Sequence, residues 1–259
     1  MQPAGATALA QAGEVPALLV NRVGEGRAIL LNFQLPAARV EDDPDVAAAW
    51  DVLRALYAAT GVGSPMQVTA PDGGALPFCE TRFWRNGDAL VFGTYRKMRC
   101  AWFNPGSGTV AGEPVQARIT VPAGYHVYDL RAGKYLGETT AIDATLRWGR
   151  ANFYALVPYR LEGLSLALSS ASPEAGSTLT ATVTLDASAG SRARHAVWLQ
   201  VIDPAGDEPL WGQRVVLLQR GTGEAQFTMA WNDAPGRWRV RATELFGGQT
   251  AEAAWTVSE

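Results

Sequence analysis

Apolar and polar residues alternate in short runs, separated by turn-forming residues, through most of the chain after Pro65. In TRFWRNGDALVFGTY two such runs flank Asn86-Gly87, which favours the two positive φ angles of a type I′ hairpin turn. In IDATLRWGRANFYALVP a second pair of runs flanks Gly149-Arg150 and predicts another hairpin. Together these patterns predict about seven or eight strands over residues 66–159, which suits one compact β-sandwich.

The second of these hairpins would assign its side chains to two faces. Pairing across its two-residue turn would place Leu146 opposite Phe153 on a core face. Asn152 and Tyr154 would then lie on the opposite, wetter face. We therefore expect a sheet with one buried and one solvated side.

After Arg160 the strand pattern restarts, with turn signals at the spacing typical of β-sandwiches, about every 8–12 residues. In GRWRVRATEL three apolar residues, beginning with Trp238, alternate with three arginines, so one core face is expected. No cysteine occurs here, so the inter-sheet disulfide of antibody domains is absent. The pattern predicts an immunoglobulin-like sandwich of about seven strands. The strand-like runs are 164–170, 178–185, 195–202, 213–218, 225–231, 237–243 and 251–257.

The N-terminal residues follow a different pattern. PALLVNRVGEGRAILLNF contains two nearly continuous apolar runs joined at Gly24-Glu25-Gly26, which is typical of strands buried on both faces. In EDDPDVAAAWDVLRALYAATG, Asp43 is the expected N-cap, Pro44 the first helical residue and Gly61 the C-terminal cap. The apolar residues between them, Val46, Trp50, Leu53 and Tyr57, follow helical spacing.

One hairpin and one helix cannot cover strands on two faces, so this region is interpreted as the end of an α/β domain whose other strands lie elsewhere. The missing partners would be upstream domains of a parent chain or an oligomer partner. The expected fold class is mainly β, with two consecutive β-sandwiches after a partial α/β segment. The expected domains are 1–64, 65–161 and 162–259, the last of them immunoglobulin-like.

Charge and composition argue against several kinds of partner. With 22 basic and 25 acidic residues, the net charge of -3 creates no field that would gather nucleic acid or anionic lipid. No uncharged apolar run approaches the ~20 residues of a membrane helix. The N-terminus has no basic start and no apolar core of leader length, so we expect no export signal in this chain. Localisation is therefore left open.

The sequence contains no recognisable catalytic or metal-binding constellation. His126 and His195 are the only histidines, neither lies near a GxSxG motif, and both are interpreted as structural or solvent-facing. The acidic run 41–45 suits the N-terminus of a helix better than a metal site. Cys79 and Cys100 form no zinc pattern, and a bond between them is left open. We expect no cofactor.

Carbohydrate binding is the one chemistry that the composition keeps open. RCAWFNPGSG contains Trp102, Phe103 and Asn104 in an expected loop, and Trp84 lies on the preceding hairpin. An aromatic ring beside an amide suits the mixed apolar and hydroxyl surface of a sugar. The alternative interpretation is that these aromatic residues close the end of a sandwich core.

The stretch YHVYDLRAGKYLGET combines many residue types that are common in active sites. Turn chemistry explains it as a hairpin with a bulge. Asp129 would accept backbone N–H groups, Gly133 would supply the left-handed position, and Lys134 would resume the strand pairing.

Three stretches together resemble the region after the catalytic barrel in β-galactosidase-like glycoside hydrolases of family 42. ALAQAGEVPALLVNRVGEGRAILLNFQL resembles the end of their α/β trimerisation domain. VYDLRAGKYLGET and LRWGRANFYALVPYRLEGL resemble the β-sandwich that follows it. PGRWRVRATELFGGQTAEAAWTV is similar to the closing hairpin of bacterial immunoglobulin-like modules.

The resemblance implies a non-catalytic accessory and assembly region of a carbohydrate-active protein. In that family both catalytic glutamates lie on a barrel upstream of the matched region, so the resemblance assigns no catalytic residue to this sequence. It implies a parent that is periplasmic or secreted. The alternatives are a carbohydrate-binding module, a self-sufficient hydrolase with a carboxylate pair, and a cell-surface scaffold or adhesion module.

Overall fold

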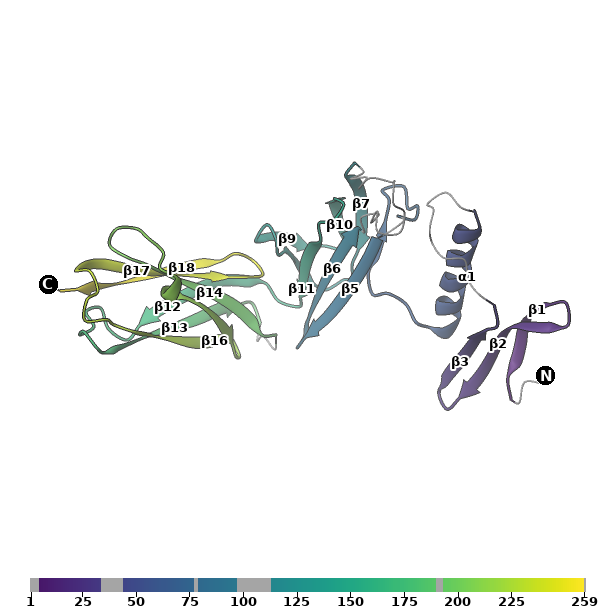
Figure 1. Ribbon diagram of the computed structural model, residues 1–259, viewed down its shortest axis with the longest axis horizontal. Helices are drawn as coiled ribbons and strands as arrows, with labels where there is room; N and C mark the ends of the chain where they lie inside the picture. The colour runs from purple at the N-terminus through teal and green to yellow at the C-terminus, as the bar shows by residue number, and fades with distance from the viewer. Residues whose placement is uncertain (1–4, 34–43, 77–78, 97–112, 190–192, 259) are drawn as a thin grey trace, which may run out of the picture. The chain divides into compact units, whose positions relative to one another are not determined.

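The structure, a computed structural model, describes residues 5–33, 44–76, 79–96, 113–189 and 193–258 (Figure 1). The chain divides into two compact units, Met1–Pro65 and Met66–Glu259. Antiparallel strands make up most of the described residues, and a single α-helix occurs among them. The prediction of a mainly β chain is therefore confirmed.

The first unit contains a three-stranded antiparallel sheet with the order β1-β2-β3. Its strands are β1 (Thr7–Ala12), β2 (Val15–Val23) and β3 (Gly26–Leu31). Val23 pairs with Gly26, and Gly24 has a φ of 59°, so the predicted hairpin forms at this position. The sequence analysis missed β1, because TALAQA combines small residues with weak apolar alternation.

Helix α1 (Pro44–Thr60) ends as its sequence predicts. Gly61 has a φ of 73°, its N–H donates to the Ala58 carbonyl at 3.1 Å, and the Val62 N–H donates to the Tyr57 carbonyl at 3.1 Å. This pair of bonds satisfies two carbonyls at the end of the helix in a Schellman motif. The expected N-cap, Asp43, lies outside the described residues.

The second unit begins with a sandwich of two sheets, in the orders β10-β7-β4 and β5-β6-β11-β8-β9. The buried cluster between them includes Phe92, Ile119, Val127, Leu146 and Leu156. The strands are β4 (Gln67–Thr69), β5 (Cys79–Asn86), β6 (Ala89–Arg96), β7 (Val115–Thr120), β8 (His126–Asp129), β9 (Lys134–Glu138), β10 (Ala141–Leu146) and β11 (Asn152–Val157).

The predicted strand pairing across Gly149-Arg150 is wrong, because β10 and β11 lie in different sheets. A turn does form here, since Gly149 has a φ of 68° and Arg147 and Arg150 form an isolated antiparallel bridge. Leu146 pairs with Val115 of β7, whereas Phe153 pairs with Gly93 of β6. The intervening residues 147–151 cross from one sheet to the other. Alternation alone does not distinguish two strands paired in one hairpin from two strands in facing sheets. In both arrangements, alternate apolar residues point into the same core.

The faces of β11 change with this correction. Tyr154 is buried and stacks on Phe92 in the core, with ring centroids 5.1 Å apart. Phe153 consequently faces outward, opposite to the prediction. The burial pattern of β11 does not alternate after Phe153, because Tyr154 and Leu156 belong to one buried cluster and Ala155 and Val157 to the other.

The hairpin between β5 and β6 exists, but its turn differs by one residue. Asn86 pairs with Ala89, so the loop consists of Gly87 and Asp88. Gly87 has a φ of 63°, and within the described ranges Arg220 is the one non-glycine residue with positive φ. The predicted type I′ turn is therefore wrong, because one positive φ at the first central position belongs to the type II′ class.

The second sandwich has sheets in the orders β12-β13-β16 and β15-β14-β17-β18. Its core includes the stacked rings of Trp238 and Trp255, whose centroids are 5.9 Å apart. The expected seven strands are present, and a short 3-10 helix, η2 (Leu210–Gly212), precedes β15. The strands are β12 (Leu161–Leu168), β13 (Thr178–Ala187), β14 (His195–Ile202), β15 (Gln213–Leu218), β16 (Thr222–Thr228), β17 (Gly236–Glu244) and β18 (Thr250–Val257).

The buried cluster of the second sandwich extends to four residues of the first, Ala89, Tyr128, Ala155 and Val157. The Asn86 amide group donates to the Arg194 carbonyl at 2.8 Å and accepts from the Arg194 N–H at 3.0 Å. The Tyr128 hydroxyl accepts the Leu161 N–H at 2.8 Å. These bonds fix the β5–β6 turn and strand β8 of the first sandwich to the second.

The turn in YHVYDLRAGKYLGET follows its predicted chemistry. One Asp129 carboxylate oxygen accepts the Arg131 N–H at 2.9 Å and the Ala132 N–H at 3.1 Å. Gly133 has a φ of 56°, and Lys134 pairs with Asp129. The functional-looking residues therefore form a bulged hairpin, as expected.

Removing the Asp129 carboxylate should weaken this hairpin. We expect Asp129→Ala to lower the free energy of unfolding by about 1 kcal/mol, because two backbone N–H groups lose their acceptor. Urea titration followed by tryptophan fluorescence measures the change. Asp143→Ala, at an exposed carboxylate 3.4 Å from Arg118, is the matched control and should change stability by less than about 0.5 kcal/mol. Equal losses in both variants would contradict a special role for the turn.

Candidate functional site

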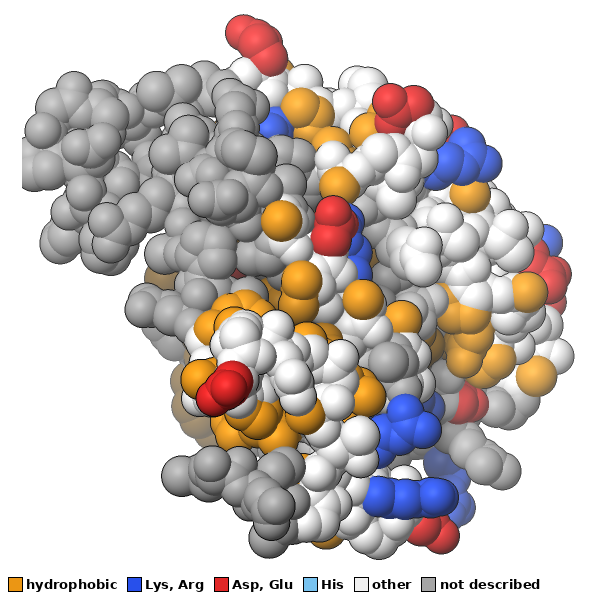
Figure 2. All heavy atoms as spheres, turned by 90° about the vertical axis from the view of Figure 1, so that its right-hand side faces the viewer, with side chains coloured by type: hydrophobic (Ala, Val, Ile, Leu, Met, Phe, Trp, Pro, Cys, Tyr) orange, Lys and Arg blue, Asp and Glu red, His pale blue; other side chains and the backbone are white. Residues whose placement is uncertain are grey.

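The first unit presents apolar side chains to solvent. None of the described side chains within residues 1–65 is buried, although its strands carry the apolar runs expected of buried strands. Leu30, for example, is 58% exposed. Figure 2 shows hydrophobic side chains in several groups at the surface on this side of the molecule. The large exposed apolar residues of the unit are Leu9, Val15, Val23, Leu30, Phe33, Val52, Tyr57 and Val62.

The sheet of this unit also has two edges. Among the described residues, β1 and β3 each pair on one side only, with β2 between them. An edge strand presents unpaired N–H and C=O groups that can accept a further strand. The predicted burial on both faces therefore does not occur within the described part of this unit.

Of the four predicted carbohydrate-binding residues, the structure places one. Trp84 lies on β5 and is 50% exposed. Trp102, Phe103 and Asn104 lie outside the described residues. Phe153, which the sequence analysis assigned to the core, lies next to Trp84 with ring centroids 6.5 Å apart. The wrong β10–β11 hairpin concealed this pair, because it reversed the faces of β11.

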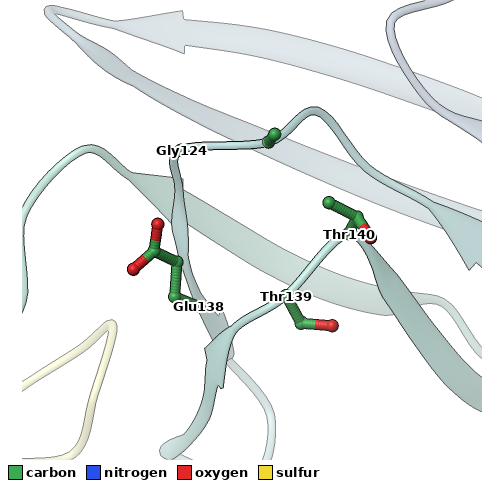
Figure 3. Close-up of a pocket in the computed structure, with 5 residues that line it drawn as sticks. Gly124, Glu138, Thr139 and Thr140 are labelled. Atoms are coloured by element: carbon green, nitrogen blue, oxygen red, sulfur yellow. The ribbon is translucent and has the colours of Figure 1, made fainter.

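A hollow of about 330 Å³ lies beside the β9–β10 turn (Figure 3). Glu138, Thr139 and Thr140 line it from this turn, and Ala123 and Gly124 line it from the segment before β8. The Thr139 hydroxyl is already used locally, since it donates to the Ala141 carbonyl at 2.9 Å. Glu138 is the one titratable side chain among the lining residues, so the hollow has no acid–base pair.

His195 lies in a buried polar network at the joint between the two sandwiches. Its Nδ1 is 2.9 Å from Glu244 Oε1, its Nε2 is 3.0 Å from the Tyr159 hydroxyl, and both His195 and Glu244 are 0% exposed. The other Glu244 oxygen accepts the N–H groups of Phe246 at 2.9 Å and Gly247 at 2.7 Å. The order of groups resembles a catalytic triad, but a substrate cannot reach it, so its role is structural.

His126 occupies a different environment. Its Nδ1 is 2.7 Å from the Tyr135 hydroxyl, and the two rings lie 5.8 Å apart on the neighbouring strands β8 and β9. In the described part of the chain, its hydrogen-bond partner is a tyrosine and not a serine or cysteine. Both histidines therefore have a tyrosine partner, and neither has a serine or cysteine partner among the described residues.

Three groups in the described ranges have clearly shifted pKa values, and burial is the main cause for each. Burial raises the pKa of the Cys79 thiol, against a lowering by its hydrogen bond to Thr94. Burial likewise raises the pKa of Tyr128 and of Tyr154. Cys79 is a free thiol, and Cys100 lies outside the described residues. A raised pKa keeps Cys79 protonated and so makes it a poor nucleophile.

The described residues contain neither a candidate metal site nor a candidate membrane helix. No group of three or more His, Cys, Asp or Glu side chains in the described ranges is placed to hold a metal ion. No helix in this part of the chain combines the length and the hydropathy that a membrane crossing requires.

Comparisons with known proteins give only distant similarity. No protein-family model matches the chain, and no curated protein matches its sequence. Similar solved structures include the adhesin InvE of Yersinia pseudotuberculosis, at 14% identity and a TM-score of 0.31, covering 75% of this chain and 55% of that chain. A β-glycosidase from Bacteroides vulgatus matches at 10% identity and a TM-score of 0.27, covering 70% of this chain and 25% of that one.

A glycosyl hydrolase family 2 member from Bacteroides cellulosilyticus is similar at 15% identity and a TM-score of 0.27, covering 59% of this chain and 25% of that one. Several of the similar structures are thus parts of glycoside hydrolases. Likeness at these scores identifies neither a family nor an activity. The resemblance to family 42 therefore remains an expectation from the sequence.

Proposed function

We propose that residues 1–65 form a docking segment through which this chain joins a larger α/β assembly, with the two sandwiches as non-catalytic accessory modules. The proposal rests on one observation: no described side chain of the β1–β3 sheet or of helix α1 is buried. Apolar strands of this kind are normally covered on both faces in α/β domains. A three-stranded sheet with one accompanying helix becomes more stable when further strands or helices cover its apolar side chains.

The partner that fits this surface is a set of strands and helices from an α/β domain. Strands can extend the sheet at β1 or β3, and helices can cover exposed residues such as Leu9, Val23 and Leu30. They can belong to the same polypeptide or to an oligomer partner. The sequence resemblance supports a β-galactosidase-like, carbohydrate-active parent. The seven strands of the last sandwich, in sheets of three and four, support its immunoglobulin-like interpretation.

A charge placed in the apolar sheet should prevent docking. We expect Leu30→Glu to release the chain from its native assembly, because a carboxylate at a buried contact is strongly unfavourable. The matched control is Leu217→Glu on β15, since Leu217 is 57% exposed and Leu30 is 58% exposed. The measurement is hydrogen exchange by mass spectrometry on the tagged full chain purified from its own cells.

In the native assembly, the amides of β1–β3 should exchange about tenfold or more slowly than in the purified single chain. Leu30→Glu should remove this protection, and Leu217→Glu should retain it. Fast exchange of β1–β3 in the native assembly would contradict the proposal. An equal loss of protection in both variants would also contradict it.

A further inference from the structure

The outer face of the five-stranded sheet carries aromatic side chains that its core does not use. Strands β5, β6 and β11 lie next to each other in this sheet (Figure 1). Arg82 and Phe153 both pair with Gly93, one from each side, so the three residues form a row across the sheet. Trp84 lies two residues along β5 from Arg82 and therefore on the same face.

The two aromatic rings meet over the backbone of Gly93. A Cβ added at Gly93 would lie 2.8 Å from Phe153 Cε1 and 3.5 Å from Trp84 Cζ3. Phe153 therefore lies over the glycine, and the ring of Trp84 reaches the same spot. The ring centroids are 6.5 Å apart and the planes are inclined by 40°. Because Gly93 has no side chain, both rings can lie close to the sheet and beside each other, and together they form a shallow aromatic surface.

Packing does not account for this arrangement. Neither Trp84 nor Phe153 belongs to the two buried clusters that form the cores. Trp84 remains 50% exposed, although a buried tryptophan ring would stabilise the fold far more. Apolar side chains that lie together at the surface mark an interaction site more often than apolar residues that are scattered singly.

The charged neighbours define the kind of ligand. Arg82 and Glu80 flank the rings, 75% and 38% exposed and 3.9 Å apart. The guanidinium offers hydrogen-bond donors and the carboxylate offers acceptors, while their charges cancel. A pyranose ring needs an apolar surface for its C–H face and both donors and acceptors for its hydroxyl groups. A polyanion would instead require unbalanced positive charge.

We propose that Trp84, Phe153 and Arg82 form a shallow binding surface for neutral, pyranose-based saccharides. The rings stack on the sugar, and Arg82 with Glu80 binds its hydroxyl groups. This surface lies in the second unit and does not depend on the docking proposed for residues 1–65. A failure of docking would therefore leave the saccharide proposal unchanged, and the reverse also holds.

Affinity electrophoresis of the full chain tests the proposal. The gels contain β-1,4-galactan, arabinoxylan, galactomannan or hydroxyethylcellulose, and polygalacturonate serves as the anionic comparison. At least one neutral polysaccharide should slow the wild-type chain. Trp84→Ala should weaken this binding by about tenfold or more, the loss expected when one stacked ring is removed. Trp84→Phe should retain part of it.

Trp231→Ala is the matched control, because Trp231 is 85% exposed and lies on the second sandwich. It should bind as the wild type does, and thermal unfolding should show that both Trp84 variants remain folded. Binding to polygalacturonate alone would overturn the proposal, as would the absence of binding to every polysaccharide. Equal losses for Trp84→Ala and Trp231→Ala would also overturn it. So would self-association of the chain that Trp84→Ala abolishes, because the face would then bind protein.

Discussion

Replacing Glu244 with alanine should lower the free energy of unfolding of the second unit by about 3–5 kcal/mol, because three buried polar groups lose a hydrogen-bond partner at a cost of about 1–3 kcal/mol each. Glu244 is 0% exposed, and its two oxygens contact His195 Nδ1 and the N–H groups of Phe246 and Gly247. With alanine at this position, the His195 ring nitrogen and the two backbone N–H groups would lose their hydrogen-bond partner in a site that water does not reach.

Equilibrium urea unfolding, followed by tryptophan fluorescence, measures the loss. Glu252→Ala is the matched control, because Glu252 lies on β18, is 42% exposed and contacts Arg241 at 2.7 Å. An exposed pair of this kind contributes less than about 1 kcal/mol. His195→Ala combined with Glu244→Ala should cost less than the sum of the single variants, because the two groups contact each other. If Glu244→Ala and Glu252→Ala lowered the free energy of unfolding equally, the buried network would not stabilise the unit more than an exposed ion pair does.

The network also holds the linker between the two sandwiches against the second sandwich. Tyr159 precedes β12, His195 begins β14 and Glu244 ends β17, so one chain of contacts spans the linker and two strands of the second sandwich. The Asn86–Arg194 pair adds a contact from the β5–β6 turn. We therefore expect Glu244→Ala to loosen the joint as well as the fold.

The fold could be predicted where local chemistry decides the structure. Turn and cap residues acted locally: Gly61 ended helix α1, and Asp129 with Gly133 formed the bulged hairpin. Alternation also placed Trp238, Val240 and Ala242 in the core, where they are 5%, 0% and 0% exposed. These features depend on a few neighbouring residues, which the sequence presents directly.

The errors concern pairing partners that are distant in sequence. Phe153 was predicted to be a core residue because β11 was expected to pair with β10. Strand β11 instead pairs with β6 and β8. Asn86 looked like a turn residue, but its side chain binds the backbone of Arg194, 108 positions away. The candidate saccharide surface combines β5, β6 and β11, so Trp84 could be proposed from the sequence and its partner Phe153 could not.

The tryptophans of the last sandwich give the second large prediction, because sequence alone does not separate buried from exposed ones. Trp255 is 2% exposed, pairs with Trp238 in the β17–β18 ladder, and stacks on it with an interplanar angle of 17°. Trp255→Ala would leave a large cavity between the sheets and also remove this stacking. We expect it to lower the free energy of unfolding by about 3–5 kcal/mol.

Trp231→Ala provides the comparison, since it removes the same side chain from a position that is 85% exposed. The Trp231 ring contacts Gly176 but is otherwise exposed to solvent. We therefore expect Trp231→Ala to lower the free energy of unfolding by no more than about 0.5 kcal/mol. Urea titration followed by far-ultraviolet circular dichroism, which reports β-structure, measures the stability of each variant. This signal does not depend on the tryptophan fluorescence that each substitution alters. Trp255→Phe should recover part of the loss, because a smaller ring still fills some of the cavity. If Trp255→Ala unfolded at the same urea concentration as Trp231→Ala, the stacked pair would not be the centre of this core.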